Sequence, residues 1–287
     1  MDELSQLSDA LLDLIECISN ENLKLIIGGG FGIYLRHTEL LKKGNTQTLL
    51  KNWPQPRSTN DLDLFLKTEL LADSSKLMPL LNAIHKLGYK PIEAAKYYQF
   101  FKPGPDGGEA GGFKIDILTG SVEHLRKIGV KADSRRAHPK PKIELHAHPV
   151  DGALTLEEHL KSVVIESSGR KGEVFIPHPF SFIMMKLFAL RDRINDSEKD
   201  YGRHHALDIY TVVAMMTARE WEESLSLSGK HKNDSKAKEA TGIVDEIFKD
   251  ASSLGVIRLK ESKYYKADFQ LNDFLKALKD LFNIACK

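Results

Sequence analysis

Two aspartates, one residue apart inside an apolar run, constrain this chain more than any other feature of its sequence. Asp61 and Asp63 alternate with leucines in the run 61–66, a pattern typical of a β-strand that buries one face. Alternate residues of a strand share a face, so both carboxylates project the same way, about 7 Å apart at their backbones. Such carboxylates repel each other unless a cation lies between them, and oxygen ligands of this charge favour Mg²⁺ or Mn²⁺. An acidic pair where a strand meets solvent is the alternative.

A glycine cluster at 28–32 precedes the aspartates, between the apolar segment 23–27 and a helical pattern over 31–41. Glycines directly after a buried strand let backbone amides approach phosphate oxygens, and the N-terminus of the following helix carries a partial positive charge. We therefore predict a nucleotide-phosphate cradle that includes Gly29 and Gly30. The spacing matches neither the dinucleotide-binding fingerprint nor a P-loop, and a tight turn without a ligand is the alternative.

Three more residues extend this candidate site. Asp116 lies in the alternating run 113–118, after a glycine-rich turn at 104–112 that joins the run to a preceding strand. A third carboxylate there would bind the ion or act as a base, and an edge-strand acid paired only with Lys114 is the alternative. Arg57 and Ser58 come just before the two aspartates, where they can bind phosphate or orient the carboxylates.

Two charged residues in the second half of the chain interrupt apolar helical patterns. Lys186 lies in a predicted helix over 180–193, where an unpaired ammonium would be costly, so we expect an anionic partner. Asp208 is the candidate partner, on a second predicted helix over 199–216 whose polar stripe includes Asp200 and His204. A salt bridge that merely ties the two helices together is the alternative.

Composition agrees with a globular protein of class α/β (α+β). The chain has 287 residues, of which 41% are hydrophobic and 28% charged, and its net charge is +1. Contact with nucleic acid would therefore need a local basic patch. The two cysteines, Cys17 and Cys286, have no spacing that indicates a disulfide or a zinc site. With no basic-then-apolar leader and no apolar span, we expect a cytoplasmic protein without membrane contact.

Two loops carry weaker signals. Residues 44–56 have the character of an insertion, and we expect it near the site, where it would shape the choice of acceptor. The basic loop Arg135–Lys142 could contact RNA phosphates, but we interpret it as a solvated loop because the net charge is near neutral and no stacking aromatic residue is nearby. A short strand is predicted at Ile143–Leu145. His146 and His148 could share a strand face as zinc ligands, but no cysteine or third histidine has suitable spacing.

The motif series resembles that of the DNA polymerase beta nucleotidyltransferase superfamily. It consists of Gly29-Gly30-Phe31, Arg57-x-Thr59-x-Asp61-Leu62-Asp63 and Lys114-Ile115-Asp116. The segment 186–210, which contains Lys186 and Asp208, is similar to the AbiEii-type toxins of abortive-infection and type IV toxin–antitoxin systems. The resemblance covers residues 27–210 and leaves the last helices unmatched.

This resemblance implies a polymerase-beta-like mixed sheet flanked by helices, with a catalytic domain at 1–170 and a helical domain at 171–287 that completes the nucleotide site. It implies that Asp61 and Asp63 bind the metal and that Lys186 and Asp208 are essential. The implied reaction moves a nucleoside monophosphate from a nucleoside triphosphate to an acceptor, in some members the 3′ end of tRNA, and the implied partner is a cognate antitoxin. Adenylylation of a small molecule such as an aminoglycoside, or a catalytically silent nucleotide- or partner-binding module, are the alternatives.

Overall fold

A computed structural model describes residues 3–284 apart from 20, 22, 45, 56, 58 and 105–111. Ser58 and most of the predicted glycine-rich turn therefore lie outside the described residues. The chain forms two compact units, each assembled from separate stretches of sequence. The sheet unit comprises Met1–Arg36, Ser58–Val150 and His159–Pro177, and the helical unit comprises His37–Arg57, Asp151–Glu158 and His178–Lys287.

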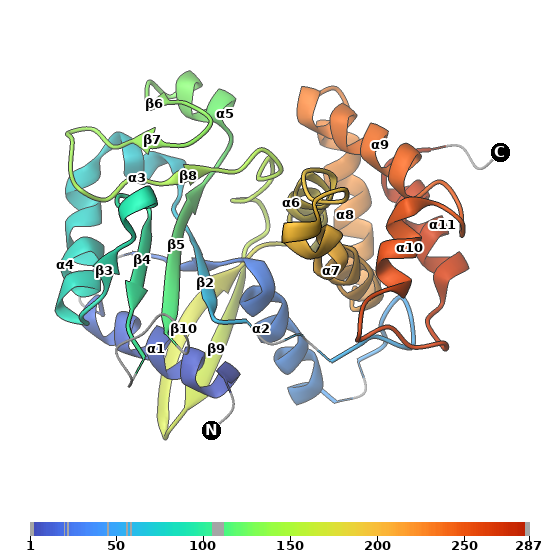
Figure 1. Cartoon of the computed structure of the whole chain (residues 1–287), viewed down its shortest axis with the longest axis horizontal. Coiled ribbons are helices and arrows are strands. Elements are labelled where there is room, and N and C mark those ends of the chain that lie inside the picture. Colours follow the sequence, from blue (N-terminus) through green and yellow to red (C-terminus); the bar gives the residue numbers. More distant parts are fainter. Residues whose placement is uncertain are drawn as a thin grey trace. The chain divides into compact units, whose positions relative to one another are not determined.

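The sheet unit is built on an eight-stranded mixed sheet (Figure 1). Seven strands follow one another in the order β3-β4-β5-β2-β1-β10-β9, and β8 also pairs with β5. The pairs β2 with β5, β1 with β10 and β5 with β8 are parallel, and the others are antiparallel. The strands are β1 (Ile26–Ile27), β2 (Asp61–Phe65), β3 (Lys90–Pro91), β4 (Gln99–Lys102), β5 (Phe113–Thr119), β8 (His148–Pro149), β9 (Lys161–Ser167) and β10 (Arg170–Ile176), with a separate pair β6 (Lys131–Ala132) and β7 (Ala137–His138).

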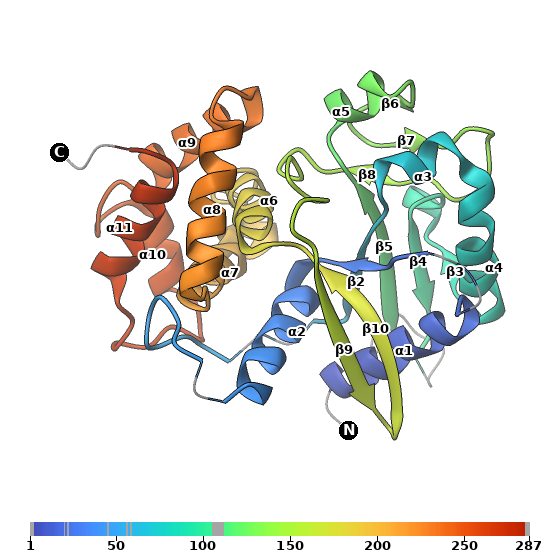
Figure 2. The same ribbon diagram turned by 180° about the vertical axis from the view of Figure 1, so that it is seen from behind.

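Helices flank this sheet, as the sequence predicts. They are α1 (Glu3–Cys17), the start of α2 (Gly29–Lys42), α3 (Thr68–Ala72), α4 (Met78–Lys86) and α5 (Val122–Lys127), with short 3₁₀ turns at Ser74–Leu77 and Glu93–Ala95. Helix α1 lies against the hairpin of β9 and β10 (Figure 2). Its leucines are buried there, and the Arg170 guanidinium donates to the carboxylates of Asp9 and Asp13 at 3.2 and 2.6 Å. The apolar stripe of α1 and this ion cluster together fix the helix on the sheet.

The helical unit surrounds α6, which is buried on nearly every side. A helix that is apolar all round belongs in a core, and α6 contacts α7, α8 and α9. The helices of this unit are α6 (Pro179–Arg191), α7 (Arg203–Ala214), α8 (Ala218–His231), α9 (Ser235–Ile247), α10 (Leu254–Lys260) and α11 (Leu271–Leu281), with a 3₁₀ segment at Ser197–Gly202. Among the described residues, every helix is too short or too polar to cross a membrane.

Two local predictions were wrong. Ile143–Leu145 forms no strand. The helix expected from residue 199 begins only at Arg203, because Asp200 and Tyr201 have positive φ angles of 52° and 51°.

The predicted insertion at 44–56 belongs to the helical unit. The backbone N–H groups of Leu49 and Leu50 donate to the carbonyls of Met216 and Ala214 at 2.7 and 3.1 Å. The phenolic O–H of Tyr210 donates to the carbonyl of Asn52 at 2.8 Å. These bonds attach the segment to the C-terminal end of α7 and the residues that follow it.

Candidate functional site

The pairing of β2 with β5 brings the predicted carboxylates together. The two strands are parallel, and their register sets Asp63 directly opposite Asp116 and Asp61 opposite Lys114. Residues opposite each other in a sheet point to the same side, and Asp61 shares that side of β2 because it lies two residues from Asp63. The alternate residues of both strands are buried. The acids therefore gather on one face while apolar side chains anchor the other, as the alternation predicts.

Asp116 has the most perturbed environment of the three. Burial, followed by the negative charges of Asp63 and Asp61, raises the pKa of Asp116 to about 7, although a hydrogen bond from the Gln99 side chain opposes that rise. Within the described part of the chain, its buried Oδ1 atom accepts no hydrogen bond. A buried oxygen that lacks a donor is destabilising, and an ion or a proton would relieve it.

The glycine turn contacts this acidic face. Gly29 has a φ angle of +58°, and a Cβ atom added to it would lie 1.5 Å from Oδ2 of Asp63. The N–H of Gly28 donates to the Asp63 carbonyl at 2.9 Å, and helical hydrogen bonding begins where the N–H of Gly32 donates to the Gly28 carbonyl. The first amides of α2, including that of Gly30, have no acceptor within the helix. The turn thus sets the positive end of a helix dipole beside Asp63.

The three aspartates are ligands of the kind that Mg²⁺ or Mn²⁺ prefers, but their described positions do not form a complete metal site. Hard divalent cations prefer carboxylate oxygens, and the unpartnered oxygen of Asp116 fits that preference. Across the described residues, no three histidine, cysteine, aspartate or glutamate side chains converge closely enough to hold an ion as they stand. The assignment of Asp61, Asp63 and Asp116 as metal ligands therefore stays a prediction.

In the helical unit, Lys186 has the anionic partner that its apolar surroundings predict. Its Nζ atom on α6 donates to Oδ2 of Asp208 on α7 at 2.6 Å, and both side chains are almost fully buried. Arg57 approaches the other oxygen of Asp208, with 3.6 Å between Nε and Oδ1. Burial alone would raise the pKa of Asp208, but the charges of Lys186 and Arg57 prevail and lower it. One carboxylate therefore faces two cations.

Two histidines near these cations, His204 and His205, have lowered pKa values. Burial, then the charges of Arg57 and Lys186, lowers the pKa of His204 to about 4. Burial lowers the pKa of His205 well below its usual value, and Arg193 lies 3.0 Å from its Nε2 atom. Burial is the main cause of both shifts, the charges of Arg57 and Lys186 add to it, and both histidines are neutral near pH 7.

Some residues of the candidate site were missed or misplaced by the sequence reasoning. Asp200 is not part of the stripe on α7, because it precedes the helix and pairs with Arg203. Gln99 was missed, although the predicted strand pair around residues 104–112 could have placed it opposite Asp116. Arg193 and His205 were also missed, and no sequence motif singles them out.

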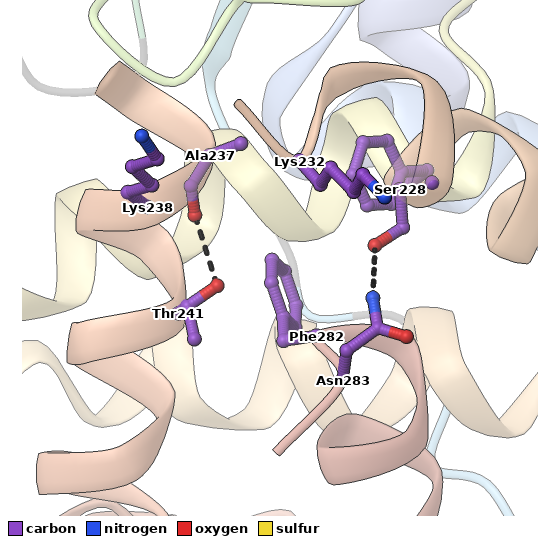
Figure 3. Close-up of a pocket in the computed structure, with 9 residues that line it drawn as sticks. Ser228, Lys232, Ala237, Lys238, Thr241, Phe282 and Asn283 are labelled. Carbon is purple, nitrogen blue, oxygen red and sulfur yellow. Dashed lines mark hydrogen bonds between the residues drawn. The ribbon is translucent and has the colours of Figure 1, made fainter. Parts of the chain in front are cut away.

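The helical unit also contains a pocket of about 550 Å³ that no predicted site residue lines (Figure 3). The Phe282 ring lies between Thr241 on one side and Ser228 and Asn283 on the other. Lys232 and Lys238 also contribute to the lining, which contains no carboxylate among the described residues. This pocket therefore lacks the ligands that a divalent cation needs.

Comparisons with known proteins find similarity in fold and not in sequence. No model of a protein family and no curated protein matches the chain. One similar solved structure is an antigenic nucleotidyltransferase-like protein from Paracoccidioides brasiliensis, with 12% identity, a TM-score of 0.40, and coverage of 84% of this chain and 92% of that one. Another is the antibiotic-resistance factor ANT(2'')-Ia, with 15% identity, a TM-score of 0.35, and coverage of 81% of this chain and 100% of that one. Similarity this distant transfers neither substrate nor mechanism.

We predict that Gly29→Ala disrupts the acidic face, whereas Gly88→Ala does not. Both glycines have positive φ angles, but a Cβ atom at Gly88 meets no atom within 4 Å, whereas one at Gly29 overlaps the Asp63 carboxylate. Both variants should lose about 1 kcal/mol of stability from backbone strain. Only Gly29→Ala should lose more stability than this. The free energy of unfolding of both variants would be measured by urea unfolding monitored by circular dichroism. Equal losses would show that the turn does not press on Asp63.

We predict that Asp116→Asn stabilises the protein, and more so at pH 8 than at pH 4.5. The unfolded aspartate ionises near pH 3.8, whereas the folded one keeps its proton to about pH 7, so wild-type stability falls as the pH rises through that window. The variant cannot titrate and should avoid a loss of roughly 1 to 4 kcal/mol. Adding Mg²⁺ at pH 8 should stabilise the wild type more than the variant. A pH-independent difference in urea midpoints would contradict the raised pKa.

Proposed function

We propose that this protein is a metal-dependent nucleotidyltransferase that moves a nucleoside monophosphate from a nucleoside triphosphate to an acceptor. The observation that carries the proposal is the register that sets Asp63 opposite Asp116, with the glycine turn of α2 against Asp63. An acidic cluster beside a helix N-terminus brings together the donors for a divalent cation and those for a phosphate. The order of the sequence motifs supports the same reaction.

In the proposed reaction, an acceptor hydroxyl oxygen attacks the α-phosphorus. The new phosphorus–oxygen bond forms as the bond to the bridging oxygen breaks, and pyrophosphate leaves. Mg²⁺ or Mn²⁺, held by Asp61, Asp63 and Asp116, would neutralise charge on the phosphates and favour ionisation of the hydroxyl. The amides of Gly29 and Gly30 bind phosphate oxygens. Oδ1 of Asp116 is available to bind the ion or to accept the hydroxyl proton.

The cationic cluster of the helical unit is proposed to bind phosphate. Lys186 and Arg57 both approach the Asp208 carboxylate. A phosphate could interact with these two cations while the contact between Lys186 and Asp208 stays intact. Asp208 orients the Lys186 ammonium and offsets the cost of its burial. Ser58, next to Arg57, is proposed as a further phosphate ligand on the sequence motif alone.

RNA is the proposed acceptor, with the 3′ end of tRNA as the leading candidate, and the biological role is that of a toxin with a cognate antitoxin. This part of the proposal rests on the resemblance of the segment 186–210 to AbiEii-type toxins. Transfer to a small molecule, or nucleotide binding without transfer, would appear as distinct outcomes of the experiment below.

We predict that Asp63→Asn abolishes transfer without unfolding the protein. The substitution removes a ligand charge and also relieves repulsion at Asp116, so the variant should be at least as stable as the wild type. Incubation with each α-³²P-labelled triphosphate, Mg²⁺ and total RNA should label RNA with the wild type. Labelling should fall about a thousandfold or more with the variant, because several kcal/mol of charge stabilisation are lost.

Glu69→Gln is the matched control, since it removes an exposed acid of the same unit. It should label RNA at the wild-type rate. Label on small molecules instead of RNA would favour the adenylyltransferase alternative, and no label on any fraction would favour the silent module. Wild-type labelling by Asp63→Asn would refute the assignment of that residue.

We predict that the double variant Lys186→Met/Asp208→Leu regains stability but not activity. Either single variant leaves a buried charge without its partner and should cost about 3 to 5 kcal/mol. The double variant removes both charges and should unfold near the wild-type urea midpoint. If the pair merely ties α6 to α7, transfer should recover together with stability. Recovery of stability without transfer supports a role in phosphate binding.

A further inference from the structure

A second small pocket lies in the sheet unit, where the residues before β4 meet the loop between β6 and β7. It has a volume of about 180 Å³, and its lining includes Lys96, Tyr97, Tyr98, Arg135 and Arg136, together with one acidic residue, Glu93. No aromatic residue lies near the basic loop in the chain, which favours a solvated loop. In the fold, however, Tyr97 and Tyr98 come from a distant stretch of sequence and lie beside Arg135 and Arg136.

The tyrosine rings are held in place by stacking. Tyr97 stacks on the buried His146 ring with 4.6 Å between centroids and 15° between planes. Tyr98 stacks on His148 at 5.6 Å and 28°, and His148 Nδ1 is hydrogen-bonded to the Arg135 carbonyl at 2.9 Å. Both tyrosines are only partly buried. Rings that are fixed before a ligand arrives lose little entropy when a planar group stacks on them.

The described lining of the pocket has a net positive charge, because Lys96, Arg135 and Arg136 outnumber its one acid, Glu93. The Arg136 guanidinium and the Lys96 ammonium lie 5.4 and 5.3 Å from the centre of the Tyr97 ring. Lys96 and Arg135 are exposed, and neither forms a salt bridge with another described residue. Asp133 is occupied within its own loop, where it accepts the backbone N–H groups of Arg135 and Arg136.

The pKa of His146, whose ring stacks on Tyr97, is lowered in these surroundings. Burial, then the charges of His138 and Arg136, lowers the pKa of His146 to about 4. The side chain is therefore neutral near pH 7, because burial and, to a smaller extent, nearby positive charges disfavour its charged form.

The pocket lies in the same unit as the acidic face, next to the start of β4. Tyr98 directly precedes β4, and its carbonyl accepts the N–H of Ile117 at 2.8 Å. The next residue, Gln99, lies opposite Asp116 in the antiparallel pairing of β4 with β5, and its side chain hydrogen-bonds to that carboxylate. The two tyrosines thus directly precede, along the chain, the residue whose side chain contacts Asp116.

We infer that this pocket binds the single-stranded 3′ end of an RNA acceptor, with a base stacked on a tyrosine and phosphates on Lys96, Arg135 and Arg136. This inference rests on the proposed function and names the acceptor of that reaction. Cations interleaved with aromatic rings are the usual surface for single-stranded nucleic acid. An aminoglycoside carries several positive charges, and the same cations would repel it. The small volume suits one nucleotide unit and not a helix of duplex RNA.

The inference is tested by fluorescence anisotropy with a 5′-labelled ten-nucleotide RNA, in the Asp63→Asn background so that no transfer occurs. Lys96→Ala/Arg135→Ala should weaken binding and reduce the slope of log K against log salt by about 1.4, at roughly 0.7 for each lost phosphate contact. Tyr98→Leu should weaken binding about fivefold or more without a change in slope. Lys86→Ala/Lys90→Ala is the control, because it removes two exposed lysines of the same unit outside the pocket.

Equal losses in the control and the pocket variants would overturn the inference, because binding would then follow net charge alone. Competition by free mononucleotide as effective as that by the RNA, or equally tight binding of blunt duplex RNA, would also overturn it. RNA binding that depends on the pocket in a protein that labels no RNA would support the pocket and refute the proposed reaction. Transfer to RNA with pocket variants that bind normally would refute the pocket alone.

Discussion

The structure of the candidate site depends on one unfavourable contact, the approach of Asp63 to Asp116 across parallel strands. Repulsion and desolvation both oppose it, and the raised pKa of Asp116 measures that opposition. The apolar residues on the opposite face of β2 and β5 enforce it, since a slip of one residue would turn them out of the core and the acids into it. The packing of the core thus holds the carboxyl groups of Asp63 and Asp116 close together, although they would separate in solution. Structures that retain such an arrangement commonly do so for binding or catalysis.

The helical unit has the opposite excess of charge. Asp208 accepts from Lys186 and lies near Arg57, and the neighbouring histidines stay neutral. An isolated buried ion pair contributes little to stability, and its retention in a core agrees with a role in binding. In the proposed function, the acidic face of the sheet unit binds the ion and the cationic cluster of the helical unit binds phosphate.

Much of this chemistry could be predicted from the sequence, because it depends on local periodicity. Alternation in β2 and β5 placed the acids on one face, and the apolar setting of Lys186 predicted its anionic partner. Pairing between distant strands could not be predicted in this way. The contact of Gly29 with Asp63 and the hydrogen bond from Gln99 to Asp116 both follow from long-range register. The helix predicted from residue 199 failed because left-handed backbone overrode a favourable side-chain pattern.

In the inferred RNA complex, the pocket beside β4 would let a chain with a net charge of only +1 attract a polyanion. Attraction at the range of the Debye length depends on the local arrangement of charges and not on their sum. Asp133 is the nearest acid in the loop, and its hydrogen bonds to backbone amides keep its carboxylate within the turn while the Arg135 and Arg136 side chains stay available. The same turn therefore shapes the loop and leaves the pocket cationic. A polyanionic acceptor attracted there would still be repelled by Asp61, Asp63 and Asp116 of the same unit, unless a divalent ion neutralised these carboxylates. In the proposed reaction, RNA binding and metal binding are for this reason expected to be coupled.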